Sequence, residues 1–305
     1  MRVVYSPRYR VDIGLHVFPT EKYPLVNARA LEARIVTPAD VLEPEPASWD
    51  DLALVHTPDY LAGLRDGTLP EDAIQQLELP WSSDLVDGFR TMVGGTILSA
   101  RQAMADRTIV AHIGGGLHHA FPNHGEGFCP FNDVAVAIRV LQRDRLADRV
   151  AVVDLDVHHG NGTAFIFESD PRVFTFSMHQ QHNYPMWKPR GSLDIGLADG
   201  TGDEAFLEQL ETALPRVMAS SPDCVCYLAG ADPYEEDQLG GLRLTQEGLR
   251  RRDRLVIETV RRAGAPLVVM LAGGYARRVD DTVAIHVATI EEASRGTQVL
   301  PTVSR

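Results

Sequence analysis

Residues 150–162 contain the sequence VAVVDLDVHHGNG, in which an apolar run leads directly into acidic, histidine, glycine and asparagine residues. The run Val150–Asp154 is apolar at successive positions, which is typical of a parallel β-strand that is buried on both faces. Further short apolar runs predict strands at Arg2–Tyr5, Thr108–His112, Val173–Ser177, Cys224–Leu228 and Leu267–Leu271.

Helical patterns separate these strands, at Asp84–Met104, Asp133–Gln142, Thr201–Ala219, Thr245–Arg262 and a segment after Tyr275. The alternation of strands and helices predicts an α/β fold, in which a parallel sheet carries helices on both faces. Because the chain contains no repeat and no long linker, we expect residues 1–305 to form a single domain. The first 80 or so residues are rich in proline and irregular, and are predicted to wrap the sheet as loops and short helices.

The composition excludes some classes of protein. With 29 Lys and Arg against 42 Asp and Glu, the formal net charge is −13, which disfavours binding to the phosphate backbone of nucleic acids. Three cysteines in 305 residues argue against a disulfide framework and favour a reducing compartment. The N-terminus lacks the apolar core of a signal peptide, and no apolar stretch is long enough to span a bilayer, so we expect a cytoplasmic protein.

Clusters of glycine and polar residues follow four of the predicted strands. They are GGGLHH (114–119), DLDVHHGNG (154–162), AGADP (229–233) and AGGY (272–275). In open α/β sheets, ligands bind beyond the carboxyl ends of the strands. The sequence therefore predicts a functional site at this edge of the sheet.

Two of these clusters contain a set of metal-ligand side chains. Asp154, Asp156 and His158 alternate, so in an extended chain they would share one face. Asp232 follows a different strand and can complete the set. Two carboxylates and one imidazole, with a position left open for water, are typical of a catalytic metal site. These ligand types leave Zn²⁺, Fe²⁺ and Co²⁺ open.

The remaining clusters supply groups for acid–base chemistry. His118 and His119 suit proton transfer to and from a water molecule that the ion activates, with Asp154 and Asn161 as candidate partners that set the histidine tautomers. Tyr275 follows two glycines at a strand end, where its phenol could donate a hydrogen bond to the oxyanion of a tetrahedral intermediate.

Six motifs in order make the chain resemble the histone deacetylase family, which also contains bacterial acetylpolyamine amidohydrolases and acetoin-utilisation proteins. They are GGGLHHAFPNHGEGFCPFND (114–133), VVDLDVHHGNG (152–162), FSMH (176–179), AGADP (229–233), DQLGGL (237–242) and LAGGY (271–275). VHTPDYL (55–61) extends the match towards the N-terminus. YSPRY (5–9), DGFRTMVGGT (87–96) and DQLGGL are most similar to the class IV branch.

The resemblance implies the arginase/deacetylase fold, a three-layer structure with a parallel eight-stranded sheet between helices. It implies zinc on Asp156, His158 and Asp232, and a tandem acid–base pair formed by His118 and His119, with Asp154 and Asn161 behind them and Tyr275 polarising the carbonyl. It also implies a structural K⁺ on Asp154 and on the backbone carbonyls of Asp156, His158, Ser177 and Met178. A narrow substrate tunnel would be lined by Gly127, Phe128, Tyr184 and Leu239.

Two positions depart from the pattern of some family members. Asn161 stands where many class I members have Asp, and an amide supplies no charge, so the basicity of the paired histidine should be lower. Leu239 stands where the polyamine-selective branch has a glutamate, which weakens a polyamine reading although Glu235, Glu236 and Asp237 are near in the sequence.

We therefore expect a zinc-dependent amidohydrolase that removes an acetyl or longer acyl group from a lysine-like amine on a peptide, a protein or a small molecule. Three alternatives stay open: a hydrolase of acetylated small molecules such as polyamines, a metal-bound domain without catalysis, and an arginase-like site with two metals. The third needs more carboxylate ligands than AGADP supplies. No direct contact with nucleic acid or membrane is expected, and the oligomeric state is open.

Overall fold

The computed structural model describes residues 1–296 of the chain and contains one eight-stranded sheet in which every pair of neighbouring strands is parallel. The strand order is β2-β1-β3-β8-β7-β4-β5-β6. The strands are β1 (Arg2–Val4), β2 (Val41–Leu42), β3 (Ile109–His112), β4 (Val150–Asp154), β5 (Val173–Gln180), β6 (Leu193–Leu197), β7 (Cys224–Leu228) and β8 (Leu267–Met270). The predicted fold class is confirmed.

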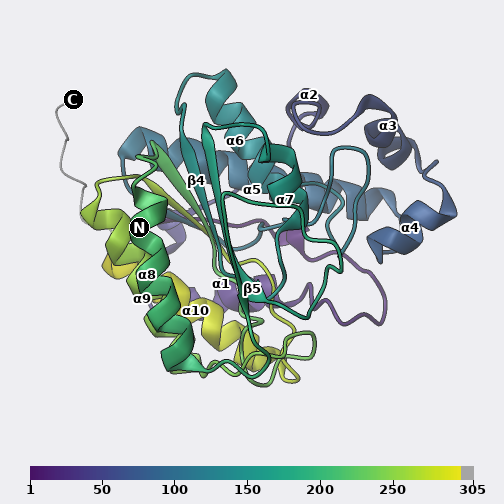
Figure 1. The fold of residues 1–305 in the computed structure, drawn as a ribbon. Helices are drawn as coiled ribbons and strands as arrows, with labels where there is room; N and C mark the ends of the chain where they lie inside the picture. Colours follow the sequence, from purple (N-terminus) through teal and green to yellow (C-terminus); the bar gives the residue numbers. More distant parts are fainter. Residues whose placement is uncertain (297–305) are drawn as a thin grey trace.

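Helices cover both faces of the sheet (Figure 1). One layer contains α5 (Ser83–Asp106), α6 (Asp133–Arg143) and α7 (Asn161–Phe167). The other contains α1 (Lys22–Glu32), α8 (Asp203–Met218), α9 (Gln246–Arg262) and α10 (Val279–Arg295). Three short helices, α2 (Trp49–Leu52), α3 (Pro58–Asp66) and α4 (Glu71–Leu77), extend outside the sheet (Figure 1). In addition, 3₁₀ turns lie at Pro7–Tyr9 and Pro38–Asp40.

The central strands are buried along their whole length, which explains their uninterrupted apolar sequence. Every residue of β3, β4, β7 and β8 is buried, since helices pack on both sides of them. Cys224 and Cys226 lie in β7 and are buried, as the sequence predicts. Polar side chains cap the N-termini of two long helices: Ser82 accepts from Leu85 N–H before α5, and Thr245 accepts from Gly248 N–H before α9.

The elements that the sequence did not predict lie mostly at the edges of the sheet. β2 has two residues, too few to show a pattern, and β6 alternates buried leucines with exposed positions because it is an edge strand. The N-terminal region is more regular than expected, because besides the predicted strand β1 it contributes β2 and the eleven-residue helix α1. α7 begins with Asn-Gly-Thr, which does not favour a helix. Across residues 1–296, the structure contains no helix of the length and apolarity that a bilayer crossing requires.

Candidate metal centre and active site

The four polar clusters of the sequence follow four strands that are neighbours in the sheet. β3, β8, β7 and β4 are adjacent, and they lead into GGGLHH, AGGY, AGADP and DLDVHHGNG respectively. Because all four strands are parallel, their carboxyl ends meet at one edge. The fold therefore brings together segments that are up to about 160 residues apart in the chain. Two contacts illustrate this: the rings of His158 and Tyr275 pack together, and the backbone N–H of Gly273 donates to Asp156.

Asp156, His158 and Asp232 converge on one point. Each offers a ligand atom, and these atoms all lie within 4.8 Å of one another. Nδ1 of His158 lies 3.0 Å from Oδ1 of Asp156 and 3.5 Å from Oδ2 of Asp232. Within residues 1–296 this is the one group of three or more such side chains close enough to share an ion.

The local backbone differs from the predicted extended chain. β4 ends at Asp154, and the chain then bends, with the N–H of Asp156 donating to Oδ1 of Asp154 (3.2 Å) and the N–H of His158 donating to Oδ1 of Asp156 (3.0 Å). The expectation that Asp154, Asp156 and His158 share one face of a strand is therefore wrong. The bend instead directs Asp154 to His118, while Asp156 and His158 face Asp232.

The unsatisfied atoms of the cluster fit a bound cation. Oδ2 of Asp232 is buried and accepts no hydrogen bond from any of residues 1–296. Burial and the adjacent carboxylate of Asp156 raise the pKa of Asp232. A Cβ on Gly273 would lie 2.0 Å from that same oxygen, so only glycine lets the backbone approach the carboxylates this closely. Two buried carboxylates with an open acceptor and one imidazole are the donor set that a divalent ion of the Zn²⁺ type requires.

The two adjacent histidines lie beside this cluster and each has a different partner. Nδ1 of His118 lies 2.7 Å from Oδ2 of Asp154, Nδ1 of His119 lies 2.8 Å from Oδ1 of Asn161, and the two Nε2 atoms are 3.1 Å apart. Burial alone would lower the pKa of His118, but Asp154 and Asp156 outweigh it and raise the pKa to about 9. Burial and the neighbouring His118 lower the pKa of His119 well below its ordinary value. The pKa values of the two imidazoles are therefore shifted in opposite directions.

Tyr275 faces His158 across the site. Its ring centroid lies 6.5 Å from that of His158 and 5.9 Å from that of Phe128. The backbone N–H of Tyr275 donates to Oδ2 of Asp237 (2.7 Å), which anchors the turn after β8. Burial, followed by the charges of Asp156 and Asp232, raises the pKa of Tyr275 well above its ordinary value, so the phenol keeps its proton and can donate it in a hydrogen bond.

A tunnel leads from the surface to these groups. Its mouth is a cavity of about 420 Å³ whose lining includes all four residues expected there, Gly127, Phe128, Tyr184 and Leu239. Gly127 and Phe128 both have positive φ values, 53° and 64°. A Cβ on Gly127 would lie 2.6 Å from Cδ2 of His119. A glycine is therefore required here, where the backbone of the tunnel wall packs against the ring of His119. A second cavity of about 30 Å³ lies at the inner end, bordered by Tyr23, Gly116 and Leu117.

The residues expected at a structural cation site lie near the carboxyl ends of β4 and β5. Asp154 pairs with Ser177 in the parallel register of these strands, and Met178 follows directly in β5. Oδ1 of Asp154 accepts from the N–H of Asp156. The sheet register therefore brings the predicted segments side by side.

Sequence reasoning missed two buried charged residues at the site. Lys22 of α1 is fully buried, and its Nζ donates to the carbonyl of Ala272 (2.9 Å). Burial lowers the pKa of Lys22 to about 8, against the opposing charges of Asp232 and Asp156. Glu126, from the loop before Gly127, bonds the side chain of Asn161. Glu126 lies inside a recognised motif, which was a usable signal, whereas nothing in the sequence around Lys22 indicates its position.

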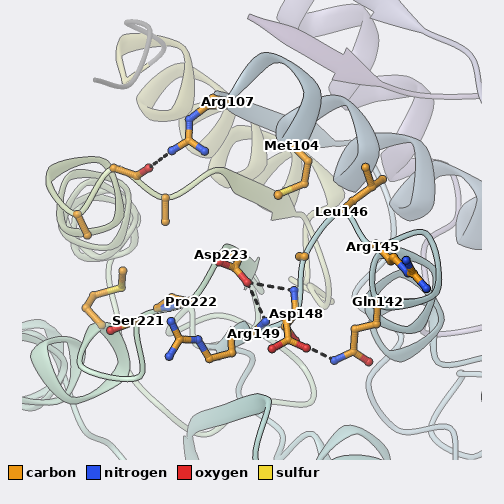
Figure 2. Close-up of a pocket in the computed structure, with 15 residues that line it drawn as sticks. Met104, Arg107, Gln142, Arg145, Leu146, Asp148, Arg149, Ser221, Pro222 and Asp223 are labelled. Carbon is orange, nitrogen blue, oxygen red and sulfur yellow. Dashed lines mark hydrogen bonds between the residues drawn. The ribbon is translucent and has the colours of Figure 1, made fainter. Parts of the chain in front are cut away.

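A further cavity lies at the amino ends of the strands, opposite the candidate site (Figure 2). It measures about 870 Å³ and is bordered by the carboxyl ends of α5, α6, α8 and α9. Nη2 of Arg107 donates to the carbonyl of Gly264 (3.0 Å), and Asp223 accepts from the backbone N–H groups of Asp148 and Arg149. Such contacts satisfy groups at helix ends and in the turns before the strands. We assign this cavity a structural role.

The fold and the site together define an amide hydrolase of the three-layer α/β type. The chain belongs to the histone deacetylase family, since the family model described as "Histone deacetylase domain" matches residues 16–290. It is a hydrolase that acts on acyl amides.

Relatives and solved structures agree with this assignment. An uncharacterized protein of Picosynechococcus sp. is 44% identical over 93% of this chain and 95% of its own length. Histone deacetylase 2 of Arabidopsis thaliana is 31% identical over 90% of this chain and 74% of its own, and the acetoin utilization protein AcuC of Bacillus subtilis is 31% identical over 89% and 76%. The crystal structure of an HDAC homologue complexed with SAHA superposes with a TM-score of 0.82 and 25% identity, covering 96% of this chain and 84% of that chain.

Proposed function

We propose that this protein is a zinc-dependent deacylase that removes a short acyl group, in particular acetyl, from the ε-amine of lysine in a peptide or protein. The observation that carries the proposal is the convergence of three metal-type ligands, a histidine pair and a protonated phenol around the inner end of one tunnel. Family membership supports acyl-amide chemistry, and the donor set of Asp156, His158 and Asp232 supports Zn²⁺.

When bound by these ligands, Zn²⁺ would supply a Lewis acid that polarises the acyl carbonyl and the attacking water. The ring of His119 borders the inner cavity, and we assign it the role of accepting the proton of that water as the water attacks. His118 lies next to it, with the two Nε2 atoms 3.1 Å apart, and Asp154 and Asp156 favour the protonated form of His118. The leaving amine takes the proton back from the pair, and Tyr275 donates a hydrogen bond to the developing oxyanion.

The shape of the tunnel supports a substrate in which a short acyl group is carried by an extended side chain such as that of lysine. Phe128 and Tyr184 line the mouth, as expected for a channel that takes an extended methylene chain. The inner cavity, of about 30 Å³, is much smaller than the mouth of about 420 Å³. This difference favours an acetyl group over a long acyl tail at the inner end.

An acetylated polyamine is the second candidate. Glu78 lines the mouth of the tunnel and its carboxylate could attract a second amine of such a substrate. Leu239, at the same mouth, offers no charge. We prefer a lysine substrate because, among residues 1–296, Glu78 is the one acidic side chain that lines this cavity.

A series of substrates that differ in the length of the acyl group and in the amine tests the proposal. Zinc-loaded protein is assayed with acetyl-lysine, butyryl-lysine and myristoyl-lysine peptides of one sequence, and with acetylated spermidine. We expect the highest kcat/KM on the acetyl peptide and a steep fall with acyl length. SAHA, which is bound in a solved HDAC homologue, should inhibit. A preference for the myristoyl peptide or for the polyamine would overturn the proposed substrate, and inertness on every acyl amide would overturn the proposed activity.

We also propose a structural K⁺ at Asp154 and the carbonyl groups of Asp156, His158, Ser177 and Met178. The pairing of Asp154 with Ser177 supports it.

A further inference from the structure

The side-chain amide of Asn161 lies between a histidine and a carboxylate. Its Oδ1 is 2.8 Å from Nδ1 of His119, and its Nδ2 donates to Oε1 of Glu126 at 2.5 Å. All three side chains are buried, with Asn161 only 1% exposed. Glu126 and Asn161 come from different segments, the loop before Gly127 and the first turn of α7.

The carboxylate decides which way the amide points. An ionised carboxylate only accepts hydrogen bonds, so Nδ2 of Asn161 must face Glu126 and Oδ1 must face His119. That oxygen can only accept, so Nδ1 of His119 carries a proton and Nε2 keeps its lone pair. If the amide were free to rotate by half a turn, its NH₂ group would face Nδ1 and favour the opposite tautomer, in which Nε2 is protonated and cannot accept a proton.

Other contacts hold Glu126 ionised and in place. Tyr184 donates from its hydroxyl to Oε1 (3.0 Å), Gln76 donates to Oε2 (3.1 Å), and His124 lies 3.5 Å away. Burial opposes ionisation, but the hydrogen bonds outweigh it and keep the pKa of Glu126 below its ordinary value. The ring of Tyr184 packs edge-on against His119 with centroids 4.9 Å apart. The same carboxylate therefore orients the amide and an aromatic wall of the tunnel.

We propose that Glu126 is a positioning residue for proton transfer: through Asn161, it fixes the tautomer of His119 and supplies the negative charge that the amide lacks. The role in proton transfer rests on the proposed deacylase function. Asn161 and Glu126 then form a matched pair, because a carboxylate at position 161 would face a second carboxylate at hydrogen-bond distance.

The pair can be tested by exchanging its donor and acceptor. Asn161→Asp places two acceptors against each other and should lower kcat by about 10- to 100-fold, a range typical of changes to groups that orient a site. Glu126→Gln leaves the orientation of two facing amides undetermined and should lower kcat by a smaller factor. The double variant Asn161→Asp/Glu126→Gln restores one donor facing one acceptor, and should regain kcat to within a few-fold of the wild type.

Glu71→Gln is the matched control for loss of one negative charge. Glu71 lies on the exposed surface of α4, where its carboxylate accepts from Gln75 at 3.4 Å. It should leave kcat unchanged. Bound zinc is measured in every variant, so that a loss of metal is not mistaken for a loss of orientation. If the effects of the two single substitutions simply multiply in the double variant, the proposal is overturned.

A spectroscopic measurement tests the same pair without any substrate. In protein labelled with ¹⁵N at histidine, Nδ1 of His119 should give a protonated-type shift in the wild type. In Glu126→Leu, which removes the acceptor, the signal should move towards a mixture of tautomers, with the folded ¹H–¹⁵N spectrum otherwise retained. An unchanged His119 signal would overturn the positioning role. Because this measurement needs no turnover, it separates failure of this inference from failure of the deacylase proposal.

Discussion

The hydroxyl of Tyr275 can be removed with little change in packing, because the ring makes the contacts to Phe128 and His158. In Tyr275→Phe, the oxyanion loses one hydrogen-bond donor. We expect kcat on an acetyl-lysine peptide to fall by about 10²- to 10³-fold. The unfolding temperature and the zinc content should stay close to those of the wild type.

Tyr5→Phe serves as the control for this substitution, since Tyr5 lies at the β1–β2 side of the sheet, where its N–H bonds Leu42. It should leave kcat unchanged. A Tyr275→Phe enzyme with a kcat within threefold of the wild type would contradict the assigned role of the phenol.

At the residue scale, the sequence predicted groups that follow strands and missed groups that depend on loop paths. Asp156, His158 and Asp232 could be placed together because each comes within a few residues of a strand end. The hydrogen bond between Glu126 and Asn161 could not be predicted in this way. Glu126 lies in a loop next to the left-handed backbone at Gly127 and Phe128, and no periodic sequence pattern encodes the path of such a loop. Asn161 supplies no charge to His119, and burial and the neighbouring His118 keep the pKa of that histidine well below its ordinary value. The carboxylate of Glu126 lies on the far side of the amide. The roles assigned to the site residues stay predictions.

Helix α9 ties the two loops that carry the proposed metal ligands together through one buried side chain. Nη1 of Arg252 donates to the carbonyls of Gly230 (2.6 Å) and Leu155 (3.4 Å), which precede the proposed ligands Asp232 and Asp156. Its charge is paired with Asp253 at 2.8 Å, and both side chains are almost fully buried. The α9 helix is thus a brace between the loops after β4 and β7.

Arg252→Leu should lower the free energy of unfolding by about 3–5 kcal/mol, because it leaves Asp253 as a buried, unpaired charge. Zinc affinity should fall as well, since two loop carbonyls lose their shared donor. Both are measured by denaturant unfolding and by zinc titration of the protein that remains folded.

The neighbouring Arg251 offers a control on the same helix, because it pairs with Glu204 at the exposed surface. Arg251→Leu should cost at most about 1 kcal/mol. Equal losses of stability in the two variants would show that Arg252 is not a brace.

At the element scale, the sequence identified buried strands and long helices, and failed at edges and short elements. Six strands were predicted from apolar runs, with bounds that differ from the structure by up to three residues. β2 and β6 were not predicted, because these short strands on the outside of the sheet lack a continuous apolar run. The assignment to the class IV branch, the single-domain organisation and the cytoplasmic location stay predictions.

Buried neutral histidines make the stability of the whole molecule depend on pH. Burial lowers the pKa of His56 to about 4, although its Nδ1 bonds the carbonyl of Phe121. Its Nε2 accepts from the N–H of Asn132, which favours the neutral ring. The unfolded state, with an ordinary pKa near 6.5, binds the proton first as pH falls. The contribution of His56 is therefore complete above about pH 6.5 and declines by about 1.4 kcal/mol per pH unit down to about pH 4.

Comparison with His56→Gln isolates this effect, because the other titrating groups are common to both proteins. The unfolding free energies of the metal-free wild type and variant are measured from pH 7 to pH 4.5. The wild type should lose stability faster than the variant as pH falls, by about 1.4 kcal/mol per unit. Parallel curves would contradict a buried neutral His56.

Titration of metal-free protein with Zn²⁺, with bound metal and hydrolysis of an acetyl-lysine peptide followed together, tests whether Asp156, His158 and Asp232 hold the ion on which catalysis depends. The rate should rise in proportion to bound zinc and reach its plateau at one ion per chain, and Asp232→Asn should bind zinc far more weakly. A plateau at two ions per chain, or full activity in Asp232→Asn without tightly bound metal, would contradict a single catalytic ion at these three residues.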